Sequence, residues 1–127
     1  MMKVFIGSGL ISLYALYSFF VYTNGTNEQL TLSLSLPEKQ QIDKGKSLFQ
    51  QYNCISCHQI YGLGGYLGPE LTTAYSDPRR GEPFIRAFLQ AGGPRMPKFG
   101  FSQEEIDALT HYLKYVDATA VTYKVNP

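Results

Sequence analysis

The stretch YNCISCHQIYGLGGYLGPEL, residues 52–71, holds both cysteines of the chain and one of its two histidines. Two residues separate Cys54 from Cys57, and His58 follows directly. A run of glycines and tyrosines comes next. This concentration of thiol and imidazole groups makes the stretch the first candidate for a functional site.

The spacing Cys54-x-x-Cys57-His58 is typical of c-type haem attachment. There, two thiols add to the two vinyl groups of one porphyrin, and the adjacent histidine is an axial ligand of the iron. A thioredoxin-like redox pair would require a βαβ context that the sequence lacks. A tetrahedral zinc site would require a fourth ligand, for which only His111 is spare, and a disulfide across two residues is uncommon. The pattern favours one covalently bound haem c.

The second axial position of such a haem would be open or occupied by another side chain. A methionine thioether raises the reduction potential and suits electron transfer, whereas an open position suits ligand chemistry. Met96 is the candidate, because it lies in the loop GPRMPKF (93–99), whose prolines restrict the backbone around it. The alternative is a methionine that fills a gap in the core. His111 lies roughly 200° from the apolar stripe of its helix, so we expect it at the surface.

The N-terminal segment Val4–Tyr22 contains nineteen residues without a charge. As a helix it would span roughly 28 Å, about the thickness of a bilayer core. Lys3 before it favours a cytoplasmic N-terminus, with the rest of the chain outside. A cleaved signal peptide shares these features, but no A-x-A-like site follows, so we expect a retained anchor.

The remaining chain is expected to form one all-α domain, because no strands alternate with the helical patterns. Three helices are predicted: from Pro37 to the cysteines, over 81–93 with a Gly-Gly stop, and from a capping box at Ser102 onward. The predicted organisation is a transmembrane helix over 1–24, a linker over 25–37 that is extended or forms a short strand, and a monohaem domain over 38–127. The net charge of +1 and the lack of a basic stripe argue against nucleic-acid binding.

Residues 38–117 resemble a class I cytochrome c. The resemblance rests on the Cys-x-x-Cys-His motif, the segment Gly68-Pro69-Glu70-Leu71, the Met96 loop and the terminal helix with LTHYLKY (109–115). It implies that the carbonyl of Pro69 accepts a hydrogen bond from the axial histidine and fixes its tautomer. It also implies that the first and last helices cross closely at a glycine, with Gly45 and Phe49 facing Leu109, Tyr112 and Leu113.

A narrower resemblance links the chain to the cytochrome c subunit of bacterial nitric oxide reductase. It rests on the N-terminal helix, on NCISCHQIYGLGGYLGPEL (53–71) and on RMPKFGFSQEEIDALTHYLKYV (95–116). It implies a subunit of the bacterial inner membrane with its haem domain in the periplasm. A soluble cytochrome c or cupredoxin would donate electrons, and the chain would pass them to an integral-membrane catalytic subunit with haem b and non-haem iron.

The same resemblance implies that backbone carbonyls of Gly64 and Tyr66 help to hold a calcium ion at the subunit boundary. A flexible surface turn is the alternative for this loop. The chain supplies no acid, base or nucleophile for NO chemistry, so it is expected to relay electrons only. A subunit of an oxygen-reducing haem-copper oxidase or other respiratory complex, and a free-standing anchored shuttle, stay open as alternatives.

Overall fold

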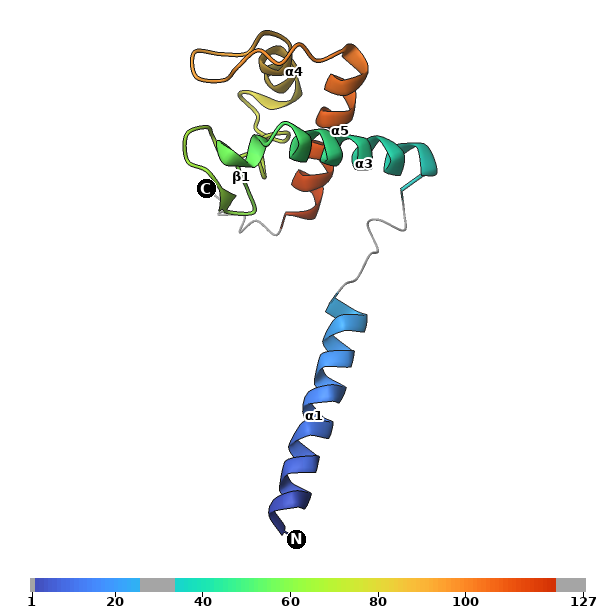
Figure 1. Cartoon of the computed structure of the whole chain (residues 1–127). Helices are drawn as coiled ribbons and strands as arrows, with labels where there is room; N and C mark the ends of the chain where they lie inside the picture. The colour runs from blue at the N-terminus through green and yellow to red at the C-terminus, as the bar shows by residue number, and fades with distance from the viewer. Residues whose placement is uncertain (1, 26–33, 121–127) are drawn as a thin grey trace. The chain divides into compact units, whose positions relative to one another are not determined.

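The computed structural model describes residues 2–25 and 34–120. Its contacts divide the chain into two units, residues 1–34 and 35–127. Most of the linker expected over 25–37, and the tail from residue 121, lie outside the described residues. The helical domain is built from α3, α4 and α5, with a short 3₁₀ turn and one small hairpin between α3 and α4 (Figure 1).

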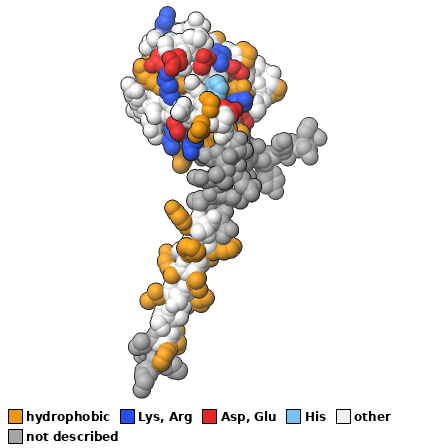
Figure 2. All heavy atoms as spheres, turned by 90° about the vertical axis from the view of Figure 1, so that its right-hand side faces the viewer, with side chains coloured by type: hydrophobic (Ala, Val, Ile, Leu, Met, Phe, Trp, Pro, Cys, Tyr) orange, Lys and Arg blue, Asp and Glu red, His pale blue; other side chains and the backbone are white. Residues whose placement is uncertain are grey.

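The N-terminal unit is the helix α1, Met2–Gly25, which contains the predicted membrane segment. Its stretch Phe5–Thr23 has a mean hydropathy of 1.5, and its large apolar side chains are exposed. Figure 2 shows hydrophobic side chains along this helix. The hydroxyl of Thr23 donates to the carbonyl of Phe19 at 2.9 Å, which satisfies it without water. The predicted helix is therefore confirmed, and it is long and apolar enough to cross a membrane.

The frame of the domain is the crossing of α3, Leu36–Gln51, and α5, Gln103–Thr119 (Figure 1). They meet at Gly45, where an added Cβ would lie 2.0 Å from the carbonyl oxygen of Ala108. Beside this contact the rings of Phe49 and Tyr112 pack with centroids 5.6 Å apart. The close crossing at Gly45 and Phe49 is therefore confirmed.

Both helices begin at capping residues that the sequence supplies. The amide of Ser102 donates to the carboxylate of Glu105 at 2.8 Å, and the amide of Glu105 donates back to the Ser102 hydroxyl. This is the predicted capping box of α5. At the start of α3, the carboxylate of Glu38 accepts hydrogen bonds from the amide and the hydroxyl of Ser35. These hydrogen bonds lower the pKa of Glu38.

The core lies around the crossing and is apolar. Its buried residues are Leu48, Phe49, Ile60, Ile85, Ala108, Leu109, Leu113 and Val116. α4, Gly81–Ala91, contributes Ile85 and matches the helix predicted over 81–93. An ion pair between Arg86 and Asp107 links α4 to α5.

The two-residue strands β1, Gln59–Ile60, and β2, Leu63–Gly64, form an antiparallel hairpin that the all-α prediction did not include. Its two-residue turn places Tyr61 and Gly62 at φ values of 54° and 73°. Two successive positive φ values are what a tight hairpin turn requires. The fold remains all-α in class, because these four residues are the whole of the sheet among the described residues.

Candidate functional site

The cysteine motif occupies one tight turn directly after α3. Asn53 adopts a left-handed conformation with φ 51°, which asparagine tolerates better than most residues, and so redirects the chain. The 3₁₀ helix η1, Cys54–Ser56, follows. The carbonyl of Cys54 accepts hydrogen bonds from the amides of Cys57 at 3.2 Å and His58 at 2.9 Å. The motif is thereby closed into a single backbone unit.

Both cysteines of this turn are free thiols and half-buried. Side chains three residues apart eclipse one another on a 3₁₀ turn, so Cys54 and Cys57 lie on the same side. Burial raises the pKa of the Cys54 thiol because the thiolate is poorly solvated there. Two thiols on one side of a turn, reachable from outside, are a suitable pair for one flat macrocycle.

The imidazole of His58 has a fixed orientation. Its Nδ1 lies 2.8 Å from the carbonyl oxygen of Pro69. A carbonyl oxygen only accepts, so Nδ1 carries the proton and Nε2 keeps its lone pair. This is the tautomer that a metal-binding histidine requires, with its second nitrogen held by a backbone carbonyl.

Gly68 packs against the same imidazole ring. A Cβ at this position would lie 2.5 Å from Cε1 of His58 and 2.6 Å from Nδ1. The amide of Gly68 also donates to the carbonyl of Cys57 at 2.7 Å. The segment Gly68-Pro69 therefore supports the histidine directly. The residues present fit a haem attached through Cys54 and Cys57 with His58 beneath its iron.

The glycine loop between His58 and Gly68 is packed closely against the cysteine turn. A Cβ on Gly64 would lie 2.1 Å from the carbonyl oxygen of His58, and one on Gly65 would lie 1.9 Å from that of Ser56. The amide of Gly65 donates to the carbonyl of Ile55 at 2.9 Å. These glycines are needed for close approach of two backbones. The side chain of Tyr66, by contrast, is 88% exposed.

Met96 is half-buried in a tight turn between α4 and α5. The amide of Gly93 donates to the carbonyl of Met96 at 2.9 Å, and the amide of Met96 donates to the carbonyl of Gly93 at 3.2 Å. Pro94 and Pro97 stand on the two sides of Arg95-Met96. The backbone is therefore closed around this methionine, as the prolines of the loop suggested.

An aromatic cluster that sequence reasoning missed connects the Met96 loop with the cysteine turn. Tyr52 packs against Phe101 with ring centroids 4.8 Å apart and against Phe99 at 5.4 Å. Tyr52 lies two residues before Cys54, and Phe99 lies three residues after Met96. The cluster thus holds the two candidate ligand-bearing segments to each other. Their spacing in the chain gave no signal of this contact.

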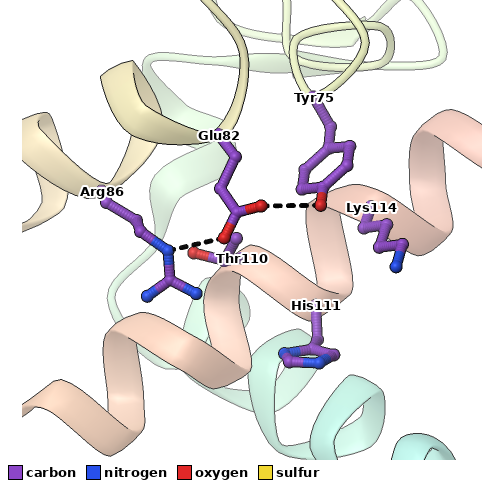
Figure 3. Close-up of a pocket in the computed structure, with 6 residues that line it drawn as sticks. All are labelled: Tyr75, Glu82, Arg86, Thr110, His111 and Lys114. Carbon is purple, nitrogen blue, oxygen red and sulfur yellow. Dashed lines mark hydrogen bonds and ion pairs between the residues drawn. The ribbon is translucent and has the colours of Figure 1, made fainter.

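His111 lies in a polar pocket apart from the cysteine turn (Figure 3). Its Nδ1–H donates to the carbonyl of Asp107 at 2.8 Å, and the residue stays partly exposed at the surface, where the helical pattern placed it. In the same pocket Glu82 accepts from Tyr75 and pairs with Arg86, both at 2.8 Å. The hydrogen bonds from Arg86 and Tyr75 lower the pKa of Glu82. The pocket joins α4 to α5 and brings none of the predicted haem ligands together.

Comparison with known proteins agrees with this geometry. Residues 40–113 match the family described as cytochrome c oxidase, cbb3-type, subunit III. The C subunit of nitric oxide reductase from Stutzerimonas stutzeri is 34% identical over 85 residues, which cover 58% of this chain and 57% of the relative. The corresponding protein from Halomonas halodenitrificans is 28% identical over 111 residues, which cover 78% of this chain and 69% of the relative.

A cytochrome c subunit of the cytochrome bc1 complex from Corynebacterium efficiens is 31% identical over 81 residues, 64% of this chain and 27% of that protein. The chain thus spans little more than half the length of the Stutzerimonas relative and about a quarter of the Corynebacterium one. The family match covers the Cys-x-x-Cys-His turn, Pro69, the Met96 loop and most of α5. The chain therefore belongs to the cbb3-type subunit III family of cytochromes c, and it is a cytochrome c subunit similar to the C subunit of nitric oxide reductase.

Proposed function

We propose that this chain is the electron-input subunit of a membrane-bound nitric oxide reductase, in which a partner subunit reduces two NO to N2O and water. The observation that carries the proposal is the Cys54–His58 turn with its histidine held by Pro69, on a chain 34% identical to the C subunit of a nitric oxide reductase. An apolar helix precedes this domain and serves as the membrane anchor.

Membership of a cytochrome c family implies covalently bound haem c, which supplies reversible one-electron exchange at its iron. We propose one haem on this chain, which Cys54 and Cys57 would hold through thioethers and whose iron His58 and Met96 would bind. The carbonyl of Pro69 accepts the hydrogen bond from Nδ1 of His58, so the lone pair on Nε2 points away from Pro69. The closed turn around Met96 restricts that side chain, which favours the same ligation before and after electron transfer.

The apolar core lies directly beside the half-buried turn and limits the access of water on that side. Ile60, directly beyond His58 and Gln59, is 6% exposed, and Leu48, before the cysteines, is 8% exposed. Low access of water reduces the reorganisation that accompanies a change of charge. This environment suits a relay that gains and loses electrons without other chemistry.

The outer face of the glycine loop is the proposed contact with the catalytic subunit. Leu63, Tyr66 and Leu67 are 70%, 88% and 54% exposed, although they are apolar or aromatic. Exposed apolar side chains in one loop are typical of an interface. The backbone carbonyls of Gly64 and Tyr66 are proposed calcium ligands in this interface. Calcium takes six to eight oxygens, so the partner and water would supply the others.

The topology follows from the anchor and Lys3. Residues 1–24 would cross the bacterial inner membrane with the N-terminus in the cytoplasm, residues 25–37 would link, and residues 38–127 would lie in the periplasm. A soluble cytochrome c or cupredoxin would reduce the haem there. Acidic and basic side chains are mixed on the face of the domain in Figure 2, so its charge does not select the donor.

The test is purification of the complex in mild detergent through a tag on this chain, with NO and O2 consumption measured with a reduced donor. The proposal predicts NO consumption, co-purifying haem b, and loss of donor-driven turnover in Met96→Ala. As a matched control, Met2→Ala changes a methionine outside the haem domain and should leave turnover unchanged. A complex that consumes O2 but no NO would contradict the proposal.

A second candidate is the same relay in an oxygen-reducing haem-copper oxidase or another respiratory complex. It is favoured by the family match itself, which carries the name of a cbb3-type oxidase, and by the likeness to a cytochrome c subunit of a bc1 complex. Purification of this chain as a lone haem c protein would instead support a free-standing anchored shuttle.

A further inference from the structure

The segment Pro69–Thr72 contains a hydrogen-bonded clasp that begins directly after the carbonyl that holds His58. The amide of Thr72 lies 3.0 Å from each carboxylate oxygen of Glu70, and the Thr72 hydroxyl also donates to that carboxylate. Thr72 is buried, with only 8% of its surface exposed. The clasp therefore fixes the backbone on the C-terminal side of the Pro69–Glu70 peptide.

Two hydrogen bonds with the hairpin hold the clasp in place. The amide of Leu71 donates to the carbonyl of Gln59 at 2.9 Å, and the amide of Tyr61 donates to the Thr72 hydroxyl oxygen at 2.6 Å. Tyr61 reaches this position in a left-handed conformation that costs a non-glycine residue free energy. Its hydroxyl lies 2.6 Å from that of Thr119, at the end of α5. Tyr61 thus links the end of α5, through its hydroxyl, to Thr72, through its amide, and Thr72 in turn holds the Glu70 side chain.

We propose that Glu70 and Thr72 are positioning residues for His58. The direction of the Pro69 carbonyl depends on the rotation of the Pro69–Glu70 peptide, and the clasp restrains that rotation. A carbonyl held toward Nδ1 strengthens the histidine as an electron donor to a metal. This inference rests on the proposed function, because it takes His58 as the axial ligand of the haem iron.

Two consequences separate this role from a purely structural one. Without the clasp the hydrogen bond from His58 to Pro69 opens more often, so the Nδ1 proton exchanges faster with water. A weaker donor also stabilises the oxidised iron less, so the reduction potential rises. A threonine that only fills the core would change the free energy of unfolding and neither of these quantities.

The test uses the full haem-loaded chain in detergent, with Thr72→Val compared to Thr73→Val. Valine keeps the shape of threonine and the net charge, so an altered potential cannot come from a lost charge. We expect Thr72→Val to exchange the His58 Nδ1 proton about 2- to 10-fold faster in NMR of the reduced protein. Its reduction potential should shift upward. Thr73 is exposed and adjacent, and its variant should change neither quantity.

Glu70→Gln is the second variant, for the case that Thr72→Val does not fold. It keeps the shape of the clasp but removes one acceptor, and the same acceleration of proton exchange is expected. If the His58 ring protons show the large shifts of a haem ligand, His58 binds the iron. A folded variant with an unchanged rate of Nδ1 proton exchange and an unchanged reduction potential would then overturn the positioning role of Glu70 and Thr72 alone. Absence of those shifts in the unmodified protein would overturn both this inference and the ligand assignment behind it.

Discussion

The crossing of α3 and α5 and the loop over residues 53–72 both depend on glycines that leave no space for a Cβ, yet the two regions are stabilised differently. At Gly45 a Cβ would meet the Ala108 carbonyl and the Cβ of Tyr112, and neighbouring residues of the two helices such as Phe49 and Leu109 are buried. At Gly65 the neighbour is the backbone of Ser56, while Leu63 and Tyr66 in the same loop are exposed. At the crossing, the close backbone contact is flanked by buried side chains, which stabilise the fold. In the loop, the close backbone contact is flanked by exposed side chains.

The largest expected effect breaks the crossing. Gly45→Val would place a branched side chain where a single Cβ already lies 2.0 Å from the Ala108 carbonyl oxygen. Overpacking of this kind should lower the free energy of unfolding by about 3 kcal/mol in urea titration. Ser47→Val is the control, because it puts valine at an exposed position of the same helix and should change stability by about 0.5 kcal/mol or less. Equal effects in the two variants would refute the close crossing.

The next effect breaks the loop and spares the helices. Gly68→Ala would press a methyl group against the His58 ring, so the hydrogen bond to Pro69 and axial ligation should be lost while helical circular dichroism is retained. The cost to stability should be about 2 kcal/mol. Gly62→Ala tests the specificity, since nothing lies within 4 Å of that Cβ. It should cost about 1 kcal/mol for its positive φ and keep the normal haem absorption spectrum.

A smaller effect concerns the aromatic cluster between the Met96 loop and Tyr52. Phe101→Leu removes the aromatic contact of Phe101 with Tyr52 and its contact with Phe99, at a cost of about 1–2 kcal/mol. It should also reduce the fraction of oxidised protein that shows the methionine-to-iron charge-transfer band. Phe84→Leu loses a comparable aromatic contact with Phe88 within α4. A similar loss of the band in both variants would show that the cluster has no specific role.

The smallest effect is a pH dependence of the contact between α4 and α5. Hydrogen bonds from Arg86 lower the pKa of Asp107 below its usual 3.8 and the pKa of Glu82 below 4.5. The unfolded chain binds protons first as the pH falls, so the ion pairs stabilise the fold above these values and are lost below them. Asp107→Asn should therefore flatten the loss of thermal stability on acidification through pH 3.8, the ordinary pKa of an aspartate side chain. An acid profile that is the same in Asp107→Asn and the unmodified protein would contradict this role of the ion pair.

The helices were predictable because their signals are local. Proline at the start of α3, the capping box at Ser102 and the Gly-Gly after Ala91 each act within one turn of the residue concerned. The Cys-x-x-Cys-His pattern was equally readable, because the macrocycle dictates its spacing. The crossing glycine was predictable only through the family resemblance.

The arrangement of the loop could not be derived in this way. The hairpin at Tyr61 requires a positive φ at a tyrosine, which sequence propensities disfavour. The contacts of Gly65 with Ser56, of Tyr52 with Phe101 and of Glu70 with Thr72 depend on how the chain returns on itself. The pocket that His111 lines with Tyr75, Glu82 and Arg86 depends likewise on the packing of separate segments.

The most direct test of the account is rapid mixing of the donor-reduced complex with NO, while the absorption of the c-type centre on this chain is followed. If the chain relays electrons, this centre is oxidised and re-reduced at the rate of NO consumption, and Met96→Ala slows both together. Steady NO consumption at full rate while the centre stays reduced would contradict an electron relay through Cys54, Cys57 and His58.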